Sequence, residues 1–572
     1  MLQLLAAPLL AAALSWVEPT ALQPGQRGVC IIEWTGGERL EIPIEVVGVL
    51  DAAAPERSAV LVRLLDPRFA DSGVVAGMSG SPVYVDGKLV GAVAFGWQFA
   101  REPIAGVTPF GRMHELAGGG APPTGTVPTL ETLTGLAAGR LDPDAAFPAP
   151  AQRAPGRMLP AAVAGVPADD PFGRRMLERL GLQAAPAGRG AAAGLPGAGD
   201  MAATLLIWGD AVVAAGGTVT ARDGDRLWAY GHPFLSLGDV TLPAARARVL
   251  AIQTSYADPF KLFTVGEPFG TFVADRPAGM LAVAGPVPPG LPVTVDVREP
   301  RGNRSWSFRV AETPLLVPFL VTYVVNASLT AQAAAAGDAS ARLLLELALA
   351  DGRTVRLEQV ASSPDALARV ASFAGAATAF LAGSPFPHPA VTGVRATVER
   401  REALTGAALL AAVPARARVR PGERLPVTVR FARHLAPAEE RVVTVEVPAG
   451  LGDGPIDLIV ADGASWGEYR QRTEGAAAVD FDGQLAQLSF LEPASNLVAA
   501  LELRDGGVAT AGDAQPGVPP SWSATLAIGL GKGNVRRLAT AVVATSRTAM
   551  PFPLAGAFRV PLTVVPLSGD RP

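Results

Sequence analysis

The stretch Val75-Ala76-Gly77-Met78-Ser79-Gly80-Ser81-Pro82-Val83-Tyr84 sets one serine between two glycines, just before an apolar run. Glycine has no Cβ atom, so it leaves room for an incoming carbonyl group and adopts backbone angles that other residues avoid. Such a loop can aim successive backbone N–H groups at one point. We therefore expect Ser79 to be a nucleophile beside an oxyanion hole. The alternative is an ordinary Gly-Ser turn joining two strands of a hairpin.

The pattern Gly-x-Ser-Gly-x-Pro at residues 77–82 resembles the nucleophile loop of chymotrypsin-like serine peptidases. In that loop the N–H groups of the serine and of the glycine two positions earlier bind the developing oxyanion. The resemblance implies that Gly77 and Ser79 supply these two N–H groups.

Residues on either side of the loop extend the resemblance. The block Asp66-Pro67-Arg68 precedes it, and Asp86-Gly87-Lys88-Leu89-Val90-Gly91-Ala92-Val93 follows it. Together with residues 77–83 they look like the SpoIVB-type serine peptidase family, which is named for a sporulation signalling protease. A later block, Leu227-Trp228-Ala229-Tyr230-Gly231-His232-Pro233-Phe234, is similar to the Gly-His motif that carries the family's general base. The resemblance implies a triad of Ser79, His232 and Asp66.

The two motifs stand in the opposite order from that of the sporulation protease, where the histidine block comes first. Here Ser79 precedes His232 by 153 residues. A circular permutation of one peptidase domain is the simplest account, because catalysis needs the groups close in space and not in a given chain order. We therefore expect a mainly β fold with a permuted, chymotrypsin-like, two-lobed β-barrel. Neither half should be able to bury its strands and close its sheet alone.

Histidine is scarce, which narrows the choice of general base to four residues: His114, His232, His388 and His434. His232 alone follows a strand-like segment and a glycine, so it is favoured as the base over a structural histidine. His114 suits a surface or helix-start position, His388 lies between two prolines, and His434 follows a strand.

The acid of the triad is less clearly marked. Asp66 matches the acidic position of the family upstream of the serine, but Asp-Pro is also a common way to open a turn. Asp71, Asp225 and Asp239 therefore stay as alternatives.

The composition argues against several classes of function. Charged residues make up 17% and the net charge is −4, so no basic surface for nucleic acid is indicated. The sequence has no phosphate-binding loop, no His-Glu-x-x-His helix and no metal-spaced acidic cluster, and we expect neither a cofactor nor a metal. Cys30 is the only cysteine, which excludes an internal disulfide. Its apolar neighbours indicate a buried, inert thiol.

Residues 1–20 resemble a secretory signal segment. The apolar run from Met1 to Leu14 has the length of a signal h-region and is shorter than the roughly 20 residues that a membrane span needs. We expect export to the periplasm or the cell exterior. Arg27 is the first basic residue, which departs from a normal signal, and the alternative is a plain apolar segment.

With 572 residues the chain should form about three or four domains. Strand patterns predict the serine half of the peptidase domain at 21–117 and the histidine half at 201–310. An Ala/Pro/Gly-rich linker, with a short helix at 172–182, would join them over 118–200. A mixed α/β segment at 311–392 would contain a helix capped by Ser363 and closed by Gly383. We expect an immunoglobulin-like β-sandwich at 393–480 and a β-rich region at 481–572.

These patterns predict an exported serine endopeptidase that acts on protein or peptide substrates and meets a cell-envelope protein as a further partner. The segment 95–109, which follows the nucleophile, should offer backbone groups to an extended substrate. The alternative is a catalytically inactive, peptidase-like scaffold or binding protein of the envelope. Intact Ser79 and His232 argue against it.

Overall fold

The computed structural model describes residues 14–50, 58–97, 99–116, 127–147, 159–188, 190, 192–331, 337–475, 477–504, 507–510, 513–516, 535–538 and 540–565. The fold is mainly β, as predicted. The chain forms two compact units. The first consists of Met1–Gly125, Ala149–Gly290 and Phe308–Thr313, and the second of Thr126–Pro148, Leu291–Ser307 and Pro314–Pro572. The predicted signal run at residues 1–13 lies outside the described residues.

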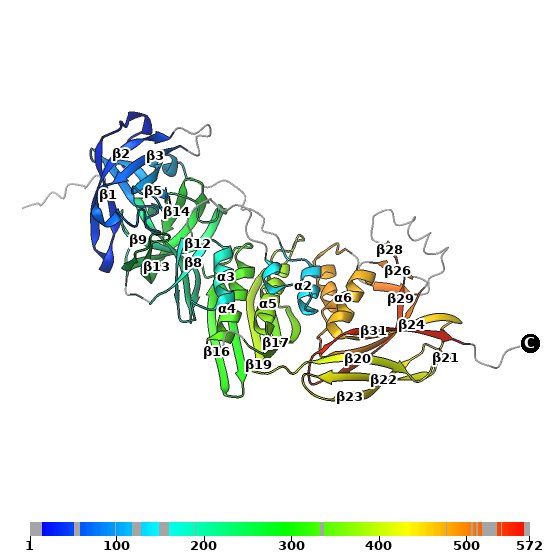
Figure 1. Cartoon of the computed structure of the whole chain (residues 1–572). Helices are drawn as coiled ribbons and strands as arrows, with labels where there is room; N and C mark the ends of the chain where they lie inside the picture. The colour runs from blue at the N-terminus through cyan, green and yellow to red at the C-terminus, as the bar shows by residue number, and fades with distance from the viewer. Residues whose placement is uncertain are drawn as a thin grey trace, which may run out of the picture. The chain divides into compact units, whose positions relative to one another are not determined.

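A closed barrel of six strands begins the first unit (Figure 1). Its strands alternate between buried and exposed residues, and the buried ones, such as Ile42, Ile44 and Val46 of β2, share one core. The order around the barrel is β1-β2-β3-β6-β5-β4. The strands are β1 (Arg27–Glu33), β2 (Arg39–Leu50), β3 (Ala59–Leu64), β4 (Pro82–Val85), β5 (Lys88–Gly96) and β6 (Ile104–Pro109).

Six further strands of this unit pair in a second ring. Antiparallel pairs run in the order β9-β12-β13-β14-β11-β10, and β10 pairs in turn with β9. The strands are β9 (Met201–Gly209), β10 (Val212–Asp223), β11 (Arg226–Ala229), β12 (Gly238–Gln253), β13 (Phe260–Arg276) and β14 (Gly279–Ala284). The expectation that neither half closes its sheet alone was wrong, because each half satisfies its strand edges within its own ring.

The stretch expected as a linker, 118–200, carries regular structure in its described part. In the first unit β7 (Leu159–Ala164) pairs with β10 and with β8 (Leu182–Pro186), and α3 (Pro171–Arg179) joins β7 to β8. Asp170 caps α3 by accepting a hydrogen bond from Gly173 N, and Gly181 at φ +75° follows its end. The predicted helix therefore exists and ends before residue 182. In the second unit α2 (Leu130–Ala137) and the 3₁₀ turn Pro143–Ala146 fall in the same stretch.

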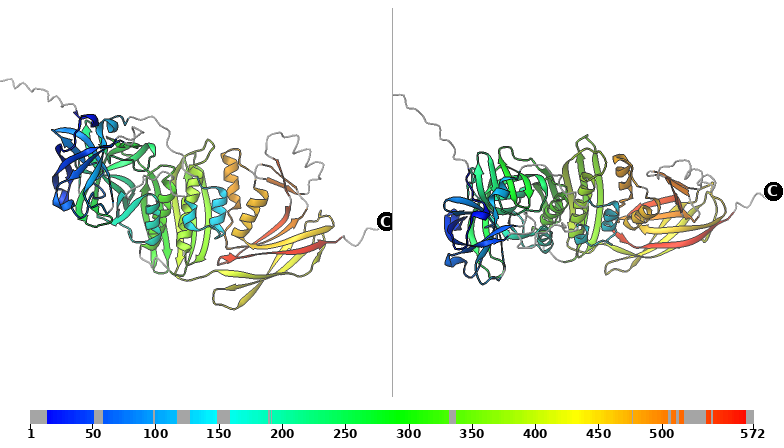
Figure 2. Two further views of the ribbon diagram at one scale, coloured as in Figure 1. Left: turned by 45° about the horizontal axis from the view of Figure 1, so that its top comes forward. Right: turned by 90° about the horizontal axis from the view of Figure 1, so that it is seen from above.

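An α/β layer opens the second unit, where α4 (Val317–Thr330) and α5 (Ala366–Ala382) pack against each other (Figure 2). The strands are β15 (Leu291–Glu299), β17 (Ala339–Leu349), β18 (Thr354–Ser363) and β19 (Val391–Arg401). Strand β16 (Gly302–Val310) begins in the second unit, and its last residues, from Phe308, belong to the first. Helix α5 ends at Gly383 as predicted, but its N-cap is Asp365, to which Ser363 donates a hydrogen bond. Of the described helices, none is both long enough and apolar enough to cross a membrane.

Two facing sheets form a sandwich farther along the second unit, and their apolar residues share one core. One sheet has β20 (Ala407–Pro414), β22 (Arg424–Arg433), β23 (Ala438–Glu446) and β30 (Leu554–Ala555). The other has β21 (Arg418–Val419), β24 (Gly454–Asp462), β25 (Asn496–Leu503), β29 (Ala541–Ala549) and β31 (Ala557–Val564). Helices α6 (Gly463–Glu474) and α7 (Phe481–Gln487) lie between β24 and β25 in the chain.

The sandwich does not follow the predicted boundaries. Strand β19 was expected to open it, but β19 pairs with β15 and β17. Strands β25, β29 and β31 come from the region after residue 480 that was assigned to a separate segment. A short sheet of β26 (Gly507–Thr510), β27 (Asp513–Pro516) and β28 (Val535–Leu538) also lies in that region.

Candidate active site

The loop that carries Ser79 leads into β4 and rests directly on the second ring. Gly77 and Gly80 both have φ +94°, where side chains are strained. A Cβ atom on Gly80 would lie 1.9 Å from the Thr218 carbonyl oxygen and 2.6 Å from Tyr230 N. The loop therefore needs glycine at residue 80, because the backbone of the second ring occupies the space of a side chain. Ser79 itself is half-buried.

Backbone hydrogen bonds fix this loop to the second ring at two places. Thr218 N donates to the Ser79 carbonyl oxygen at 2.7 Å. Ala76 N donates to the Pro259 carbonyl oxygen at 2.8 Å, and Lys261 N donates to the Ala76 carbonyl oxygen at 3.0 Å. The nucleophile loop predicted from the sequence is thus shaped jointly by both halves of the first unit.

Two N–H groups of the loop are left for a ligand. Within the residues that the structure describes, the N–H groups of Gly77 and Ser79 have no hydrogen-bond partner, whereas those of Ala76, Met78 and Gly80 are bonded. The carbonyl oxygen of the peptide before Gly77 accepts from Lys261 N, and that of the peptide before Ser79 accepts from Ser81 N at 2.8 Å. In a trans peptide the N–H points away from the C=O. Anchoring these carbonyls therefore fixes the direction of both N–H groups.

The histidine motif forms a tight turn against the first barrel. Tyr230 and Gly231 have φ +70° and +67°, and a Cβ atom on Gly231 would lie 2.9 Å from the Val93 carbonyl oxygen of β5. Thr108 Oγ1 of β6 donates to the Gly231 carbonyl oxygen at 2.6 Å. The backbone nitrogen of Tyr230 also lies next to Gly80 of the serine loop. The two motifs are far apart in sequence and therefore lie against each other in the fold. His232 comes directly after Gly231.

The His232 ring is half-buried and contacts its own loop. Its Nδ1 lies 2.7 Å from the Pro233 carbonyl oxygen. Burial lowers the pKa of His232, and the bond to Pro233 raises it by less. A neutral ring that donates its Nδ1 proton to this carbonyl keeps an unprotonated Nε2, which is the state a general base needs. Among the described residues no hydrogen bond joins His232 to Ser79.

Asp275 holds the loop after His232 and was not found by sequence reasoning. Its carboxylate is buried and accepts from Phe234 N at 2.7 Å, Leu235 N at 2.8 Å and Leu237 N at 3.0 Å. Burial raises the pKa of Asp275, and four backbone N–H groups, these three and that of Ser236, oppose that shift. An aspartate inside the apolar strand Phe272-Val273-Ala274-Asp275 was the available signal.

Among the described residues, no hydrogen bond joins Asp66 to His232. Asp66 caps the 3₁₀ turn Pro67–Phe69 and accepts from Arg68 N at 3.0 Å and Arg68 Nε at 2.9 Å. Its second oxygen lies 2.6 Å from Arg68 Nη2, and these hydrogen bonds hold the pKa of Asp66 below its usual value. Asp71 and Asp225 are exposed, and Asp239 pairs with Arg276.

The remaining histidines lie elsewhere. The His114 ring stacks on Trp228 with the ring centroids 5.5 Å apart and also contacts Trp16. His388 and His434 belong to the second unit. The segment 95–109 was expected to offer its backbone to an extended substrate. Its last part, 104–109, forms β6, which pairs on both edges, with β3 and with β5. Its backbone groups are therefore already used.

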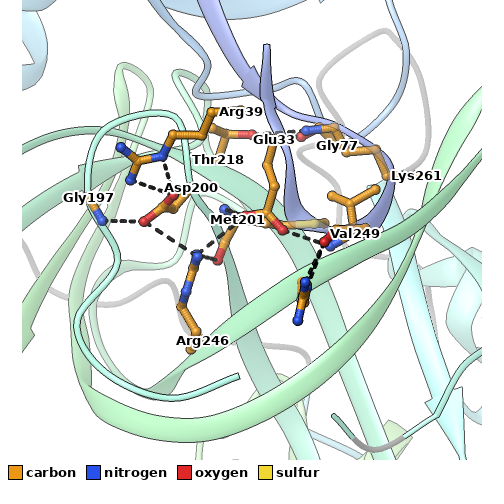
Figure 3. Close-up of polar contacts among 12 residues, drawn as sticks. Glu33, Arg39, Gly77, Gly197, Asp200, Met201, Thr218, Arg246, Val249 and Lys261 are labelled. Carbon is orange, nitrogen blue, oxygen red and sulfur yellow. Dashed lines mark hydrogen bonds and ion pairs between the residues drawn. The ribbon is translucent and has the colours of Figure 1, made fainter. Parts of the chain in front are cut away.

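Charged side chains are buried where the two halves of the first unit meet (Figure 3). Glu33, at the end of β1, is fully buried and lies 3.4 Å from Arg246 Nη1. Asp200 pairs with Arg39 at 2.6 Å and with Arg246 at 3.4 Å. Two N–H groups of the second ring also donate to Glu33 at 2.8 Å, those of Met201 and Val249. This network ties β1 and β2 to the second ring.

Cys30 is fully buried, and burial raises the pKa of its thiol to about 12, in keeping with an inert thiol. Across the described residues, no group of three or more His, Cys, Asp or Glu side chains is arranged to hold a metal ion.

Comparison with known families bears on the first barrel. Residues 20–108 match the family described as SpoIVB peptidase S55. The matched segment holds Asp66, Gly77 and Ser79 and ends before His232, and it confirms the resemblance predicted from the loop residues. The family indicates a peptidase of the serine type. No curated protein and no solved structure matches the chain.

Proposed function

We propose that this protein is a serine endopeptidase that cleaves protein substrates through an acyl-enzyme. The observation that carries the proposal is the pair of N–H groups on Gly77 and Ser79, fixed in direction and without a partner among the described residues. They flank the hydroxyl of Ser79, which stands between Gly77 and Gly80 in the loop. Two such donors stabilise the oxyanion of a tetrahedral intermediate.

In this proposal His232 is the general base. Its Nε2 takes the proton of the Ser79 hydroxyl as the oxygen attacks the scissile carbonyl carbon, and the carbonyl electrons move onto the oxygen held by the two N–H groups. His232 then protonates the leaving amine, and the acyl-enzyme forms. A water molecule, deprotonated by the same ring, releases the acid. The bond between Ser79 and His232 would form with substrate bound, since catalytic hydrogen bonds often tighten only then.

We assign the orientation of His232 to the Pro233 carbonyl, because that oxygen accepts from Nδ1 in the place where a triad acid would act. Asp66 was predicted as that acid. Its bonds to Arg68 support a different role, in which it shapes the turn that precedes the serine loop.

Three broader inferences go with this proposal. A permuted chymotrypsin-like arrangement accounts for a serine loop on the first barrel and a histidine loop on the second ring. Export would bring the peptidase to the side of the cytoplasmic membrane where SpoIVB peptidases act. The sandwich of the second unit would serve as an immunoglobulin-like module for an envelope partner.

Labelling with a fluorophosphonate tests the proposal, because this reagent reacts covalently with an activated serine. Wild-type protein should label and hydrolyse a protein substrate, and Ser79→Ala should do neither. Ser81→Ala is the matched control, since the buried Ser81 hydroxyl has no hydrogen-bond partner in the described structure and sits two residues away. Folded wild-type protein that never labels would favour the inactive scaffold.

A further inference from the structure

A lysine is buried directly beneath the serine loop. Lys261 of β13 is 0% exposed, and among the described residues its Nζ makes one hydrogen bond, to Thr218 Oγ1 at 3.5 Å. Removing an ammonium group from water is costly unless it is well paired. In the same described part no hydrogen bond joins Nζ to the Ser79 hydroxyl, and the mechanism proposed above leaves Lys261 without a role.

The stem of this lysine packs on the glycine of the candidate oxyanion hole. A Cβ atom on Gly77 would lie 3.0 Å from Lys261 Cδ and 3.2 Å from its Cβ. Lys261 N also bonds the Ala76 carbonyl oxygen, which belongs to the peptide that presents Gly77 N–H. The lysine thus meets the loop through both its backbone and its side chain.

Thr218 connects the ammonium group to the loop (Figure 3). Its hydroxyl accepts from Lys261 Nζ and donates to the Gly77 carbonyl oxygen at 2.9 Å. Its N–H donates to the Ser79 carbonyl oxygen at 2.7 Å. Because the hydroxyl proton is turned toward Gly77 when its lone pair accepts from the ammonium, the contacts form a directed chain from Nζ to the loop.

Two side chains of β1, those of Glu33 and Cys30, act electrostatically on the Lys261 ammonium group. Glu33 favours its charged form, but the carboxylate is already engaged by two N–H groups and by Arg246. Cys30 is a neutral thiol at ordinary pH, because burial raises its pKa to about 12. Burial outweighs the attraction of Glu33 and lowers the pKa of Lys261 to about 8.

We propose that Lys261 and Thr218 are positioning residues that hold the oxyanion loop in its active geometry through the chain Nζ, Thr218 Oγ1 and Gly77 C=O. This inference rests on the proposed peptidase function. When Lys261 is an ammonium, the chain is charge-assisted and the loop is fixed. When Lys261 loses its proton, the hydrogen bonds from Nζ through Thr218 to the Gly77 carbonyl weaken. The N–H groups of Gly77 and Ser79 then no longer point at the same oxygen, so kcat falls. The ammonium is present below about pH 8 and lost above it. The pH profile should therefore have an alkaline limb near that value.

The test measures kcat, KM and their pH dependence for a peptide substrate. Lys261→Met keeps the length of the stem and removes the charge; it should lower kcat at least about tenfold, leave KM within about twofold, and abolish the alkaline limb. Thr218→Val should lower kcat similarly, and Thr218→Ser should restore most of it, because only the serine keeps the hydroxyl. Lys88→Met is the control, because Lys88 is exposed on β5.

The outcomes separate the two proposals. If wild-type protein labels with fluorophosphonate and Lys261→Met keeps both the wild-type kcat and the alkaline limb, the positioning role is overturned and the peptidase function stands. If folded wild-type protein does not label, the peptidase function fails and the positioning role fails with it. If Lys261→Met does not fold, the Thr218→Val and Thr218→Ser pair decides, and equal kcat values in that pair overturn the role.

Discussion

At the scale of single residues, the glycine at position 80 is the most constrained part of the site. Replacing Gly80 by Ala should destabilise the protein by more than about 3 kcal/mol, because the new Cβ meets backbone atoms at 1.9 Å in addition to the strain of φ +94°. Gly87→Ala isolates the second effect, since Gly87 has φ +71° and nothing within 4 Å of an added Cβ. It should cost about 1 kcal/mol. Urea unfolding measures both, and equal losses would contradict the role of close packing.

The protonation of His232 should set the acid limb of activity. Its pKa is lowered from 6.5, so the neutral ring persists to a lower pH than in a free histidine. We expect kcat/KM to rise with pH and to reach half its plateau below pH 6.5. His232→Ala should abolish turnover, while His388→Ala, in the second unit, should not change it. A midpoint above 6.5, or full activity in His232→Ala, would contradict the assignment.

Asp66 offers a test between a structural and a catalytic acid. If it only shapes the turn, Asp66→Asn should reduce stability slightly and leave kcat within about threefold, whereas loss of a triad acid costs about 10⁴-fold. The pKa of Asp66 is lowered from 3.8, so its stabilisation is complete above pH 3.8 and disappears as the pH falls through the lowered value. Wild type and Asp66→Asn should therefore differ in thermal stability at pH 7 and converge in strong acid.

The sequence indicated the special backbone of the candidate site, and what it did not indicate has a physical cause. The glycines around Ser79 marked a special backbone, and the loop indeed has positive φ at residues 77 and 80. The sequence also drew attention to His232 because it follows a strand-like segment and a glycine, and in the structure this block forms a tight turn against β5. Lys261 and Asp275 were missed because each is one charge within an apolar strand, and its partners are brought to it only by folding.

At the scale of elements, the hairpin between β5 and β6 exposes aromatic side chains beside the serine loop. Phe95, Trp97 and Phe99 are 40%, 47% and 72% exposed, and a Cβ on Gly96 would lie 2.8 Å from Val74, five residues before Ser79. Exposed aromatic groups near a site often bind a partner. The pair Trp97→Ala and Phe99→Ala should raise KM for a protein substrate several-fold and leave fluorophosphonate labelling unchanged. Leu435→Ala, at a 95% exposed site of the second unit, is the control.

Strands were predictable where apolar and polar residues alternate, as in β2 and β22. The Ala/Pro/Gly-rich composition of residues 118–200 was wrongly interpreted as a sign of a flexible linker. Leu159–Ala164 lies in the Ala/Pro/Gly-rich stretch, yet all six residues are buried, because small side chains allow β7 to pack tightly beside β10. The predicted boundaries of the sandwich, 393–480, were wrong for another reason. Which sheet a strand joins, as with β19, depends on partners far away in the chain.

At the scale of the whole molecule, the first unit contains two rings whose contact brings together the residues of the candidate site. Neither ring alone holds both Ser79 and His232, and the serine loop takes several of its hydrogen bonds from the second ring. Sequence reasoning anticipated that both halves contribute. It could not show that each half closes on itself, because ring closure depends on the pairing of β9 with β10, and a period-two pattern does not reveal strand partners.

Glu33 lies on the first barrel and Lys261 on the second ring. Replacing Glu33 should therefore change the pH dependence of kcat. Its charge favours the ammonium form of Lys261 across the boundary between β1 and β13. Glu33→Gln removes that charge and keeps one oxygen, which can accept from only one of the two N–H groups of Met201 and Val249. Without the charge, Lys261 should lose its proton at a lower pH. The alkaline limb of kcat should therefore move to lower pH. Arg39→Gln changes a more exposed member of the same network and should leave the limb in place. An upward shift in Glu33→Gln, or an equal shift in both variants, would mean that the first barrel does not set the charge state beneath the serine loop.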